Sequence, residues 1–156
     1  MPRITPFLWF DNQAEQAADF YLSVFPNSKV VRAARKNESV PAETGDVMSI
    51  DLDLDGQPLT LLNGGPYFKL NEAFSLVVHC ATQAEVDRYW DSLLDGGQAS
   101  QCGWLKDRFG LSWQIVPDVL LELMADPDRA KAGRVAAAMM KMVKLDIAQL
   151  KAAAES

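Results

Sequence analysis

Apolar residues recur at helical spacing in two stretches of the chain, and each stretch follows a short run of β-forming residues. From Ala14 to Phe25 they fall at intervals of three and four behind the motif NQAE at 12–15, which is typical of a helix-opening capping box. Pro26 ends this predicted helix. The same order returns at 82–85 with TQAE, where the apolar stripe continues to Leu94. We therefore expect two amphipathic helices in equivalent places.

Alternating and β-branched runs predict strands around both helices. The expected strands are 4–10, 29–35, 47–54 and 58–63 in the first half, and 73–80, part of 99–106 and 111–116 in the second. Both halves therefore have the order strand, helix, further strands, which indicates an internal duplication. The remaining chain predicts helices at about 119–124, 128–142 and 146–154, without a counterpart in the first half.

Composition narrows the class of protein. The 156 residues carry a net charge of −6, which would repel a nucleic-acid backbone. No stretch reaches the roughly 20 apolar residues that cross a bilayer, and the N-terminus lacks a signal-peptide cleavage site. Cys80 and Cys102 are the only cysteines and are expected to be inert thiols. We expect a cytoplasmic protein that binds neither nucleic acid nor membrane.

Four segments resemble a known family: WFDNQAEQAADFYLSVFPNS, LNGGPYFKLNEAFSLVV, QCGWLKDRFGLSWQIVP and VKLDIAQL. They are similar to the PhnB-like branch, often labelled 3-demethylubiquinone-9 3-methyltransferase, of the vicinal oxygen chelate superfamily of glyoxalases and bleomycin-resistance proteins. The resemblance implies an α+β fold in which paired βαβββ modules enclose a cavity, commonly within a homodimer. The chain is then one domain, 1–156, with module one at 1–66, module two at 70–117 and a helical extension at 118–156.

In metal-dependent members of this superfamily, the first and last strands of each module supply the ligands. The matching positions here are Thr5, Thr60, Ser75 and Gln114, and the duplication supports this alignment because Thr60 and Gln114 each follow a turn glycine by four residues. Hydroxyls and a neutral amide cannot offset the dehydration of a transition metal. We predict no catalytic metal and no other cofactor. The strand, Gly-rich loop and helix that usually hold a nucleotide-type cofactor are also missing.

Gln114 lies in an apolar run, and alternation places it on the face of Ser112 and Val116. Its amide can donate to and accept from a polar ligand, or it is a buried residue satisfied by neighbours such as Thr5 and Ser75. His79 is the only histidine and shares the face of Ser75. It is either a general acid or base or a hydrogen-bonded residue without a catalytic role.

Three apolar residues complete the candidate substrate-binding set. Phe7 and Trp9 share the face of Thr5, and Met48 belongs to the alternating row Met48, Ile50, Leu52 and Leu54. Core packing is the competing interpretation for each. Near the second hairpin turn, Trp104, Lys106 and Asp107 either border a pocket mouth or are ordinary surface residues, and we favour the second interpretation.

Two further motifs are interpreted as structural. The DLDLDG segment at 51–56 opens like a calcium loop, but Leu62 occupies the position of the required glutamate. The NGGP segment at 63–66 lacks the lysine and helix of a phosphate loop, so we interpret it as a turn.

Three functions follow from these patterns. The first is a PhnB-like protein that binds a small polar organic molecule in a metal-free cavity, with or without proton transfer by His79. The second is a metal-dependent glyoxalase-like lyase or dioxygenase, or a methyltransferase as the family label says. The third is a structural dimer with a collapsed interior. The sequence leaves open whether the protein is an enzyme.

Overall fold

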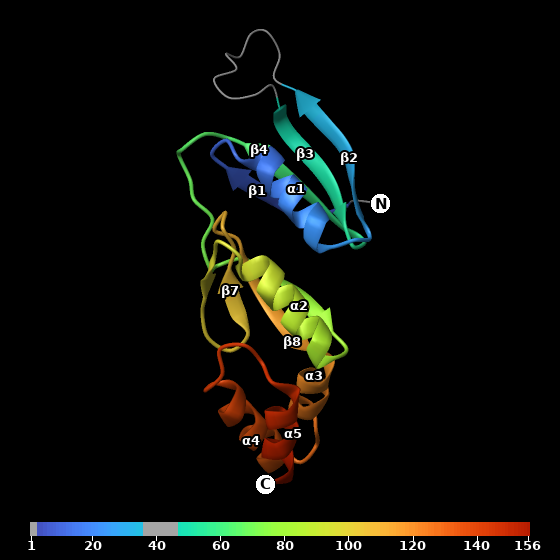
Figure 1. Ribbon diagram of the computed structural model, residues 1–156, viewed down its shortest axis with the longest axis vertical. Helices are drawn as coiled ribbons and strands as arrows, with labels where there is room; N and C mark the ends of the chain where they lie inside the picture. The colour runs from blue at the N-terminus through green and yellow to red at the C-terminus, as the bar shows by residue number, and fades with distance from the viewer. Residues whose placement is uncertain (1–2, 36–46) are drawn as a thin grey trace. The chain divides into compact units, whose positions relative to one another are not determined.

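The computed structural model describes residues 3–35 and 47–156, and the chain divides into two compact units, Met1–Leu70 and Asn71–Ser156. The first unit contains five elements in chain order (Figure 1): β1 Phe7–Phe10, α1 Ala14–Val24, β2 Ser28–Arg35, β3 Val47–Leu54 and β4 Gln57–Asn63. Its four-stranded sheet has the order β1-β4-β3-β2, with β1 parallel to β4 and the other pairs antiparallel.

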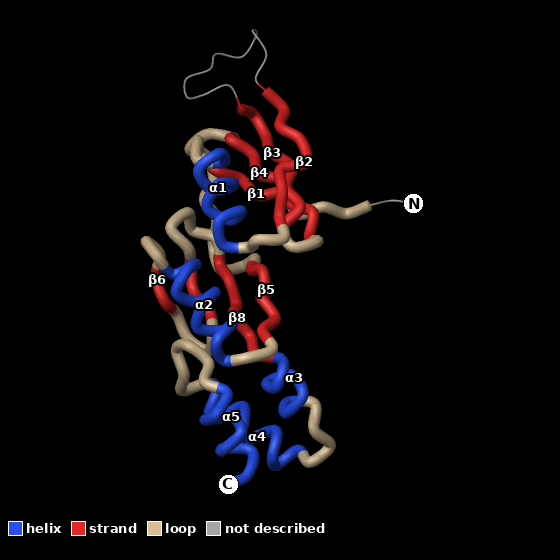
Figure 2. The backbone as a smooth tube through the Cα atoms, turned by 45° about the vertical axis from the view of Figure 1, so that its right-hand side comes forward, coloured by secondary structure: helices blue, strands red, loops and turns tan. Residues whose placement is uncertain are grey.

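The second unit repeats this topology. It comprises β5 Ser75–Cys80, α2 Gln83–Leu94, β6 Gln98–Ala99, β7 Trp104–Lys106 and β8 Ser112–Pro117. The sheet order is β5-β8-β7-β6, with β5 parallel to β8. In each unit a single helix lies along one face of its sheet (Figure 2). The α+β fold with paired βαβββ modules, expected from the duplication and the family resemblance, is confirmed.

Strand register divides each sheet into two faces. In the first, Leu61 lies beside Leu8 and opposite Ile50, and all three are buried on the side that packs under α1. In the second, Trp113 lies opposite Leu105, and both are buried on the corresponding side. We call the opposite side of each sheet, which neither α1 nor α2 covers, its helix-free face. At the end of β8, Val116 on this side packs in the apolar cluster of the C-terminal helices. Every candidate site residue must be assigned to one of these two sides.

The helix starts differ from each other in a way that the motifs did not predict. At α2, the Thr82 hydroxyl accepts from the Glu85 amide at 3.2 Å, as a capping box requires. At α1, the N-cap is Gln13 and no side chain of the NQAE motif caps the helix, so the capping-box prediction is wrong there. The side-chain oxygen Oδ1 of Asn63, from β4, instead accepts from the Ala14 amide at 2.9 Å.

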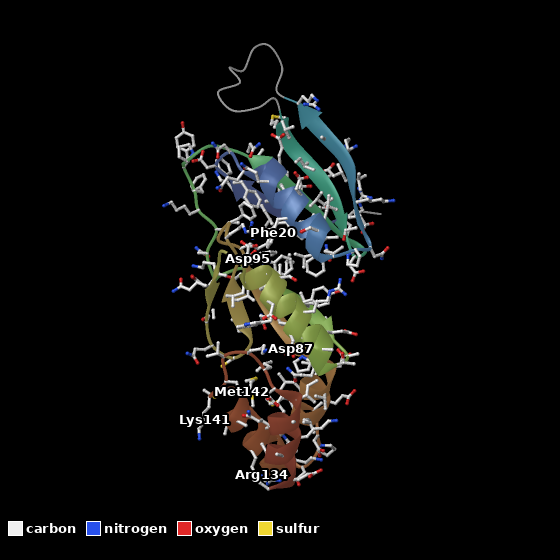
Figure 3. The ribbon with its side chains drawn as sticks, viewed as in Figure 1. Phe20, Asp87, Asp95, Arg134, Lys141 and Met142 are labelled. Atoms are coloured by element: carbon white, nitrogen blue, oxygen red, sulfur yellow. The ribbon has the colours of Figure 1, made fainter. Side chains whose placement is uncertain are left out.

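Three helices follow the second sheet: α3 Asp118–Met124, α4 Arg129–Met139 and α5 Ile147–Glu155. Their apolar cluster includes a residue of β8 and consists of Val116, Leu120, Val135, Met142, Leu145, Leu150 and Ala154. Gln83 of α2 donates to the Leu145 carbonyl at 3.1 Å and accepts from the Ile147 amide at 2.8 Å. Asp87, labelled on α2 in Figure 3, pairs with Lys144 at 2.9 Å. The helical extension is therefore fixed to α2 as well as to β8.

No helix in the described part of the chain is long and apolar enough to cross a membrane.

Gly103 provides a test of this docking. Its φ is +84°, and an added Cβ would lie 2.9 Å from Leu145 side-chain carbons and 3.1 Å from the Ile115 carbonyl oxygen. Gly103→Ala is expected to destabilise the protein by about 2–4 kcal/mol, because it combines an unfavourable left-handed backbone with overpacking. Urea unfolding measures the change.

Gly133→Ala is the matched control, because an added Cβ there meets nothing within 4 Å inside helix α4. It should stabilise the protein by up to about 1 kcal/mol through helix propensity. Equal unfolding midpoints for Gly103→Ala and the unmodified protein would contradict the docking of Leu145 on the turn.

Candidate functional site

A polar network occupies the helix-free face of the first sheet. Thr60 of β4 lies opposite Asp51 of β3, and its hydroxyl donates to Asp51 Oδ1 at 2.8 Å. Arg32 of β2 donates to Asp51 Oδ2 through Nε at 3.0 Å and Nη2 at 2.7 Å. Both carboxylate oxygens of Asp51 are therefore bound by groups of this chain. Sequence reasoning treated Asp51 only as part of the DLDLDG motif and did not single out Arg32.

The surroundings of Asp51 favour its charged form. The hydrogen bond from Thr60 and those from Arg32 lower the pKa of the Asp51 carboxyl below its ordinary value of 3.8. Burial acts in the opposite direction but does not outweigh them. Asp51 is therefore a compensated anion near neutral pH and is poorly suited to proton transfer there.

Aromatic residues of β1 lie on this side of the sheet. Phe7 lies beside Thr60 in the parallel register and is 61% exposed. Trp9 is held by the segment after β4, because its indole donates to the Gly65 carbonyl at 2.9 Å and its ring contacts Phe68 edge-on at 4.9 Å. Thr5 precedes β1 and is half-buried. Phe7 and Trp9 remain predicted contact residues, and Phe7 is the more accessible.

Met48 departs from the row to which alternation assigned it. Ile50, Leu52 and Leu54 are buried core residues, whereas Met48 is 42% exposed. The β2–β3 register shifts at this point, with Ala34 opposite Ser49 and Arg35 opposite Val47. Such an irregularity breaks the period of two. Ile50, Leu52 and Leu54 therefore belong to the hydrophobic core and do not line a cavity. Met48 is not buried with them.

Gln114 and Ser75 meet on the helix-free face of the second sheet. Gln114 Nε2 donates to Ser75 Oγ at 2.9 Å, and both side chains are partly buried. In the ladder, Gln114 lies between Val77 of β5 and Trp104 of β7. Ser75 accepts from one hydrogen of the Gln114 side-chain amide. The second hydrogen and the side-chain carbonyl oxygen of Gln114 can still bond to a ligand. The predicted proximity of Gln114 and Ser75 is therefore present within one unit.

The same face carries His79, Lys106 and Ser112, and the sequence pattern gave Ser112 no ligand role. His79 is exposed and lies beside Val116 at the far end of the strand pair. Lys106 lies opposite Ser112 and forms an ion pair with Glu72, whose carboxyl pKa is lowered by that ammonium. The Ser112 hydroxyl oxygen is buried and has no hydrogen-bond partner. A pattern of alternating residues places Ser112 on the face but cannot show that it lacks a partner.

Asp107 beside the hairpin turn was expected at the surface, and that prediction is wrong. It is only 3% exposed. It accepts from the Trp113 indole at 2.9 Å and from the Phe109 and Leu111 amides at 2.8 and 3.1 Å. Asp107 therefore holds the turn and the buried Trp113 in place, and this satisfied role does not favour ligand binding.

The surroundings of Cys80 and of the glycine-rich segment at 63–66 fit the structural roles expected for them. Burial raises the pKa of Cys80 to about 11, so its nucleophilic thiolate is scarce near neutral pH. The Gly64 and Gly65 amides donate to the Phe10 and Asp11 carbonyls at 2.8 and 3.0 Å, so they cannot cradle a phosphate at the same time.

The donor set does not fit the divalent cation that metal-dependent members of the superfamily hold. The four aligned positions carry hydroxyls and an amide, of which Thr60 donates to Asp51 and Gln114 donates to Ser75. The nearest carboxylate in the first sheet, Asp51, is already neutralised by Arg32. Within residues 3–35 and 47–156, no group of three or more His, Cys, Asp or Glu residues is placed to hold a metal ion.

Comparison with known proteins agrees with the fold. The family model described as 3-demethylubiquinone-9 3-methyltransferase matches residues 2–116. A PhnB protein from Bacillus cereus has 32% identity and a TM-score of 0.68, over 74% of this chain and 99% of that chain. A Pseudomonas aeruginosa protein has 20% identity and a TM-score of 0.59, over 75% and 98%. No curated protein matches the chain.

A fosfomycin resistance protein, FosX from Mesorhizobium loti, has 12% identity and a TM-score of 0.56, over 80% of this chain and 98% of that chain. At this identity, as for the Pseudomonas protein, the likeness concerns the fold alone. The family match ends before α3, so the three C-terminal helices lie outside it.

The Asp51 network predicts a specific response to mutation. Thr60→Val removes the largest cause of the lowered pKa, so the pKa of the Asp51 carboxyl should rise toward 3.8. Carboxyl carbon chemical shifts followed by NMR against pH measure it. Thr82→Val is the control, because Thr82 caps α2 and does not bond to Asp51.

The lowered pKa of Asp51 also determines how the stability of the protein changes with pH. A carboxyl whose folded-state pKa is depressed stabilises the protein above its ordinary pKa, and this contribution is lost as pH falls through the folded value. The Thr60→Val protein should therefore lose less stability on acidification below about 4. An unchanged Asp51 titration in Thr60→Val would contradict the network.

Proposed function

The chain belongs to the PhnB-like 3-demethylubiquinone-9 3-methyltransferase family of the vicinal oxygen chelate superfamily, and from this membership we propose that it binds a small, partly polar organic molecule without a metal ion. The proposed binding surface is the helix-free face of its sheets. The observation that carries the proposal is the hydrogen bond between Gln114 and Ser75, two positions that the predicted alignment matches to the chelating side chains of metal-dependent relatives.

The chemistry of the second sheet supports ligand binding there. Amide and hydroxyl groups from Gln114 and Ser75 lie between the apolar surfaces of Val77 and Trp104. Small-molecule sites commonly combine apolar walls with a few polar groups that fix orientation. A neutral amide both donates and accepts, so it suits a ligand with mixed polarity.

In the first sheet, Thr60 and Phe7 are the corresponding candidate contacts. Thr60 is held by Asp51, and Phe7 is largely exposed beside it. Thr5 and Trp9 stay in the proposed set as neighbours on the same strand and its approach. Met48 is the weakest member, because the register shift separates it from the row that suggested it.

His79 is the group that we assign to any proton transfer. It shares the face of Gln114 and Ser75 and is accessible to solvent. An imidazole can both donate and accept a proton in catalysis, whereas the carboxylate of Asp51 is already bound by Thr60 and Arg32. We further propose that the protein is cytoplasmic and forms a homodimer. The exposed apolar residues Val30 and Val31 on the edge strand β2 support a further protein contact.

A melting-temperature screen with small organic molecules tests the binding proposal. A ligand at about a hundred times its Kd stabilises the folded state by about 2.7 kcal/mol. For a chain of this size that raises the melting temperature by roughly 5–11 °C. Gln114→Leu should remove most of the rise, because it removes the polar contact and keeps the volume. Gln57→Leu, an exposed change in β4, is the matched control and should retain it.

Metal analysis of the same purified protein tests the metal-free part. The expected result is less than stoichiometric nickel, zinc, iron and manganese, together with a ligand effect that persists in a chelator. Sedimentation should give twice the 17.2 kDa chain mass. A stoichiometric metal whose removal abolishes ligand binding would instead establish a metal-dependent binding site.

A further inference from the structure

Ser112 is the starting point, because its buried hydroxyl lacks a partner. It is 1% exposed and lies in the ladder between Ser75 of β5 and Lys106 of β7. Leaving a buried polar group without a hydrogen bond is costly, so such groups in folded proteins usually meet a water, an ion or a ligand. The hydroxyl is therefore an unpaired donor, and a bound molecule reaches it by displacing the groups that bury it.

The neighbouring cation already holds a carboxylate. Lys106 lies directly opposite Ser112 on the helix-free face, and its ammonium forms an ion pair with Glu72 from the segment before β5. The Glu72 side chain is 65% exposed, whereas that of Lys106 is 36% exposed. An ion pair with so exposed a partner contributes little stability. A ligand can therefore replace Glu72 at Lys106, and the ion pair shows that the ammonium binds a carboxylate here.

Apolar surface lies one step along the same face. Two residues farther along β8, Gln114 is flanked by Trp104 and by Val77, which is 41% exposed. Side chains two residues apart on a strand are separated by about 6.6 Å. A molecule with its charged end at Lys106 and Ser112 would thus lay a ring or short chain against Trp104 and Val77.

We propose that the helix-free face of the second sheet binds a small carboxylic acid with an apolar body, with Lys106 and Ser112 donating to its carboxylate and Glu72 competing for Lys106. This inference rests on the proposed function and names the ligand class. A single ammonium with hydroxyl donors matches one negative charge. A phosphate, with nearly twice that charge, would call for more cations than this row supplies in a chain of net charge −6.

Matched carboxylate and carboxamide pairs test it: benzoate and benzamide, phenylacetate and phenylacetamide, hexanoate and hexanamide. Each is titrated into the full-length protein, and backbone amide shifts are followed by NMR. The carboxylates should move resonances in β5, β7 and β8, and should bind at least tenfold more tightly than their amides. Loss of one charge-assisted hydrogen bond corresponds to about that factor.

Two variants of the ion pair should change carboxylate affinity in opposite directions. Lys106→Gln should weaken carboxylate binding at least tenfold and leave carboxamide binding unchanged. Glu72→Gln should tighten carboxylate binding several-fold, because the competing carboxylate is gone. Ser112→Ala should weaken carboxylate binding without lowering the melting temperature. Lys151→Gln, an exposed change on α5, should change none of these values.

Equal affinities for each acid and its amide, with Lys106→Gln and Glu72→Gln both without effect, would overturn the inference. Carboxamide shifts confined to the same strands would then still support the proposed function. Absence of any shift in β5, β7 and β8 would also overturn the inference, and the melting-temperature screen would decide separately whether the protein binds another ligand.

Discussion

The parallel pairing of the first and last strands in each module is the constraint on which the rest depends. A parallel pair needs a crossover, and here α1 or α2 lies within the crossover and packs on one face of the sheet. Because side chains alternate along a strand, this packing divides strands such as β4 and β8 into core residues and residues on the helix-free face. Leu61 and Trp113 belong to the first kind, and Thr60 and Gln114 belong to the second.

The polar groups on the helix-free faces compensate one another. Arg32 and Thr60 satisfy Asp51 in the first sheet, and Ser75 accepts from Gln114 in the second. These contacts pair the polar side chains of Thr60, Ser75 and Gln114 within each sheet. They also concentrate the remaining hydrogen-bonding capacity at Ser112 and at the amide of Gln114.

The sequence predicted the features that repeat along the chain. Alternation and helical spacing located the strands and helices within a few residues, and the duplication correctly related the two modules. It failed at α1, because the capping residue Asn63 comes from far along the chain. It also failed at Asp107, where the Trp113 indole and two amides of the same hairpin donate to a carboxylate that local patterns assigned to the surface. It also failed at Met48, because one register shift breaks the period that local patterns assume. Specific side-chain contacts determine the environment of these residues, and composition and periodicity do not predict such contacts.

The side-chain amide of Gln114 gives the most direct test of the account. Its two hydrogens are visible in a proton–nitrogen NMR spectrum and can be followed while a ligand from the melting screen is added, with and without a chelator. The account predicts that these resonances move at saturation by the same amount in both conditions. Binding that leaves them unmoved, or that disappears in the chelator, would contradict it.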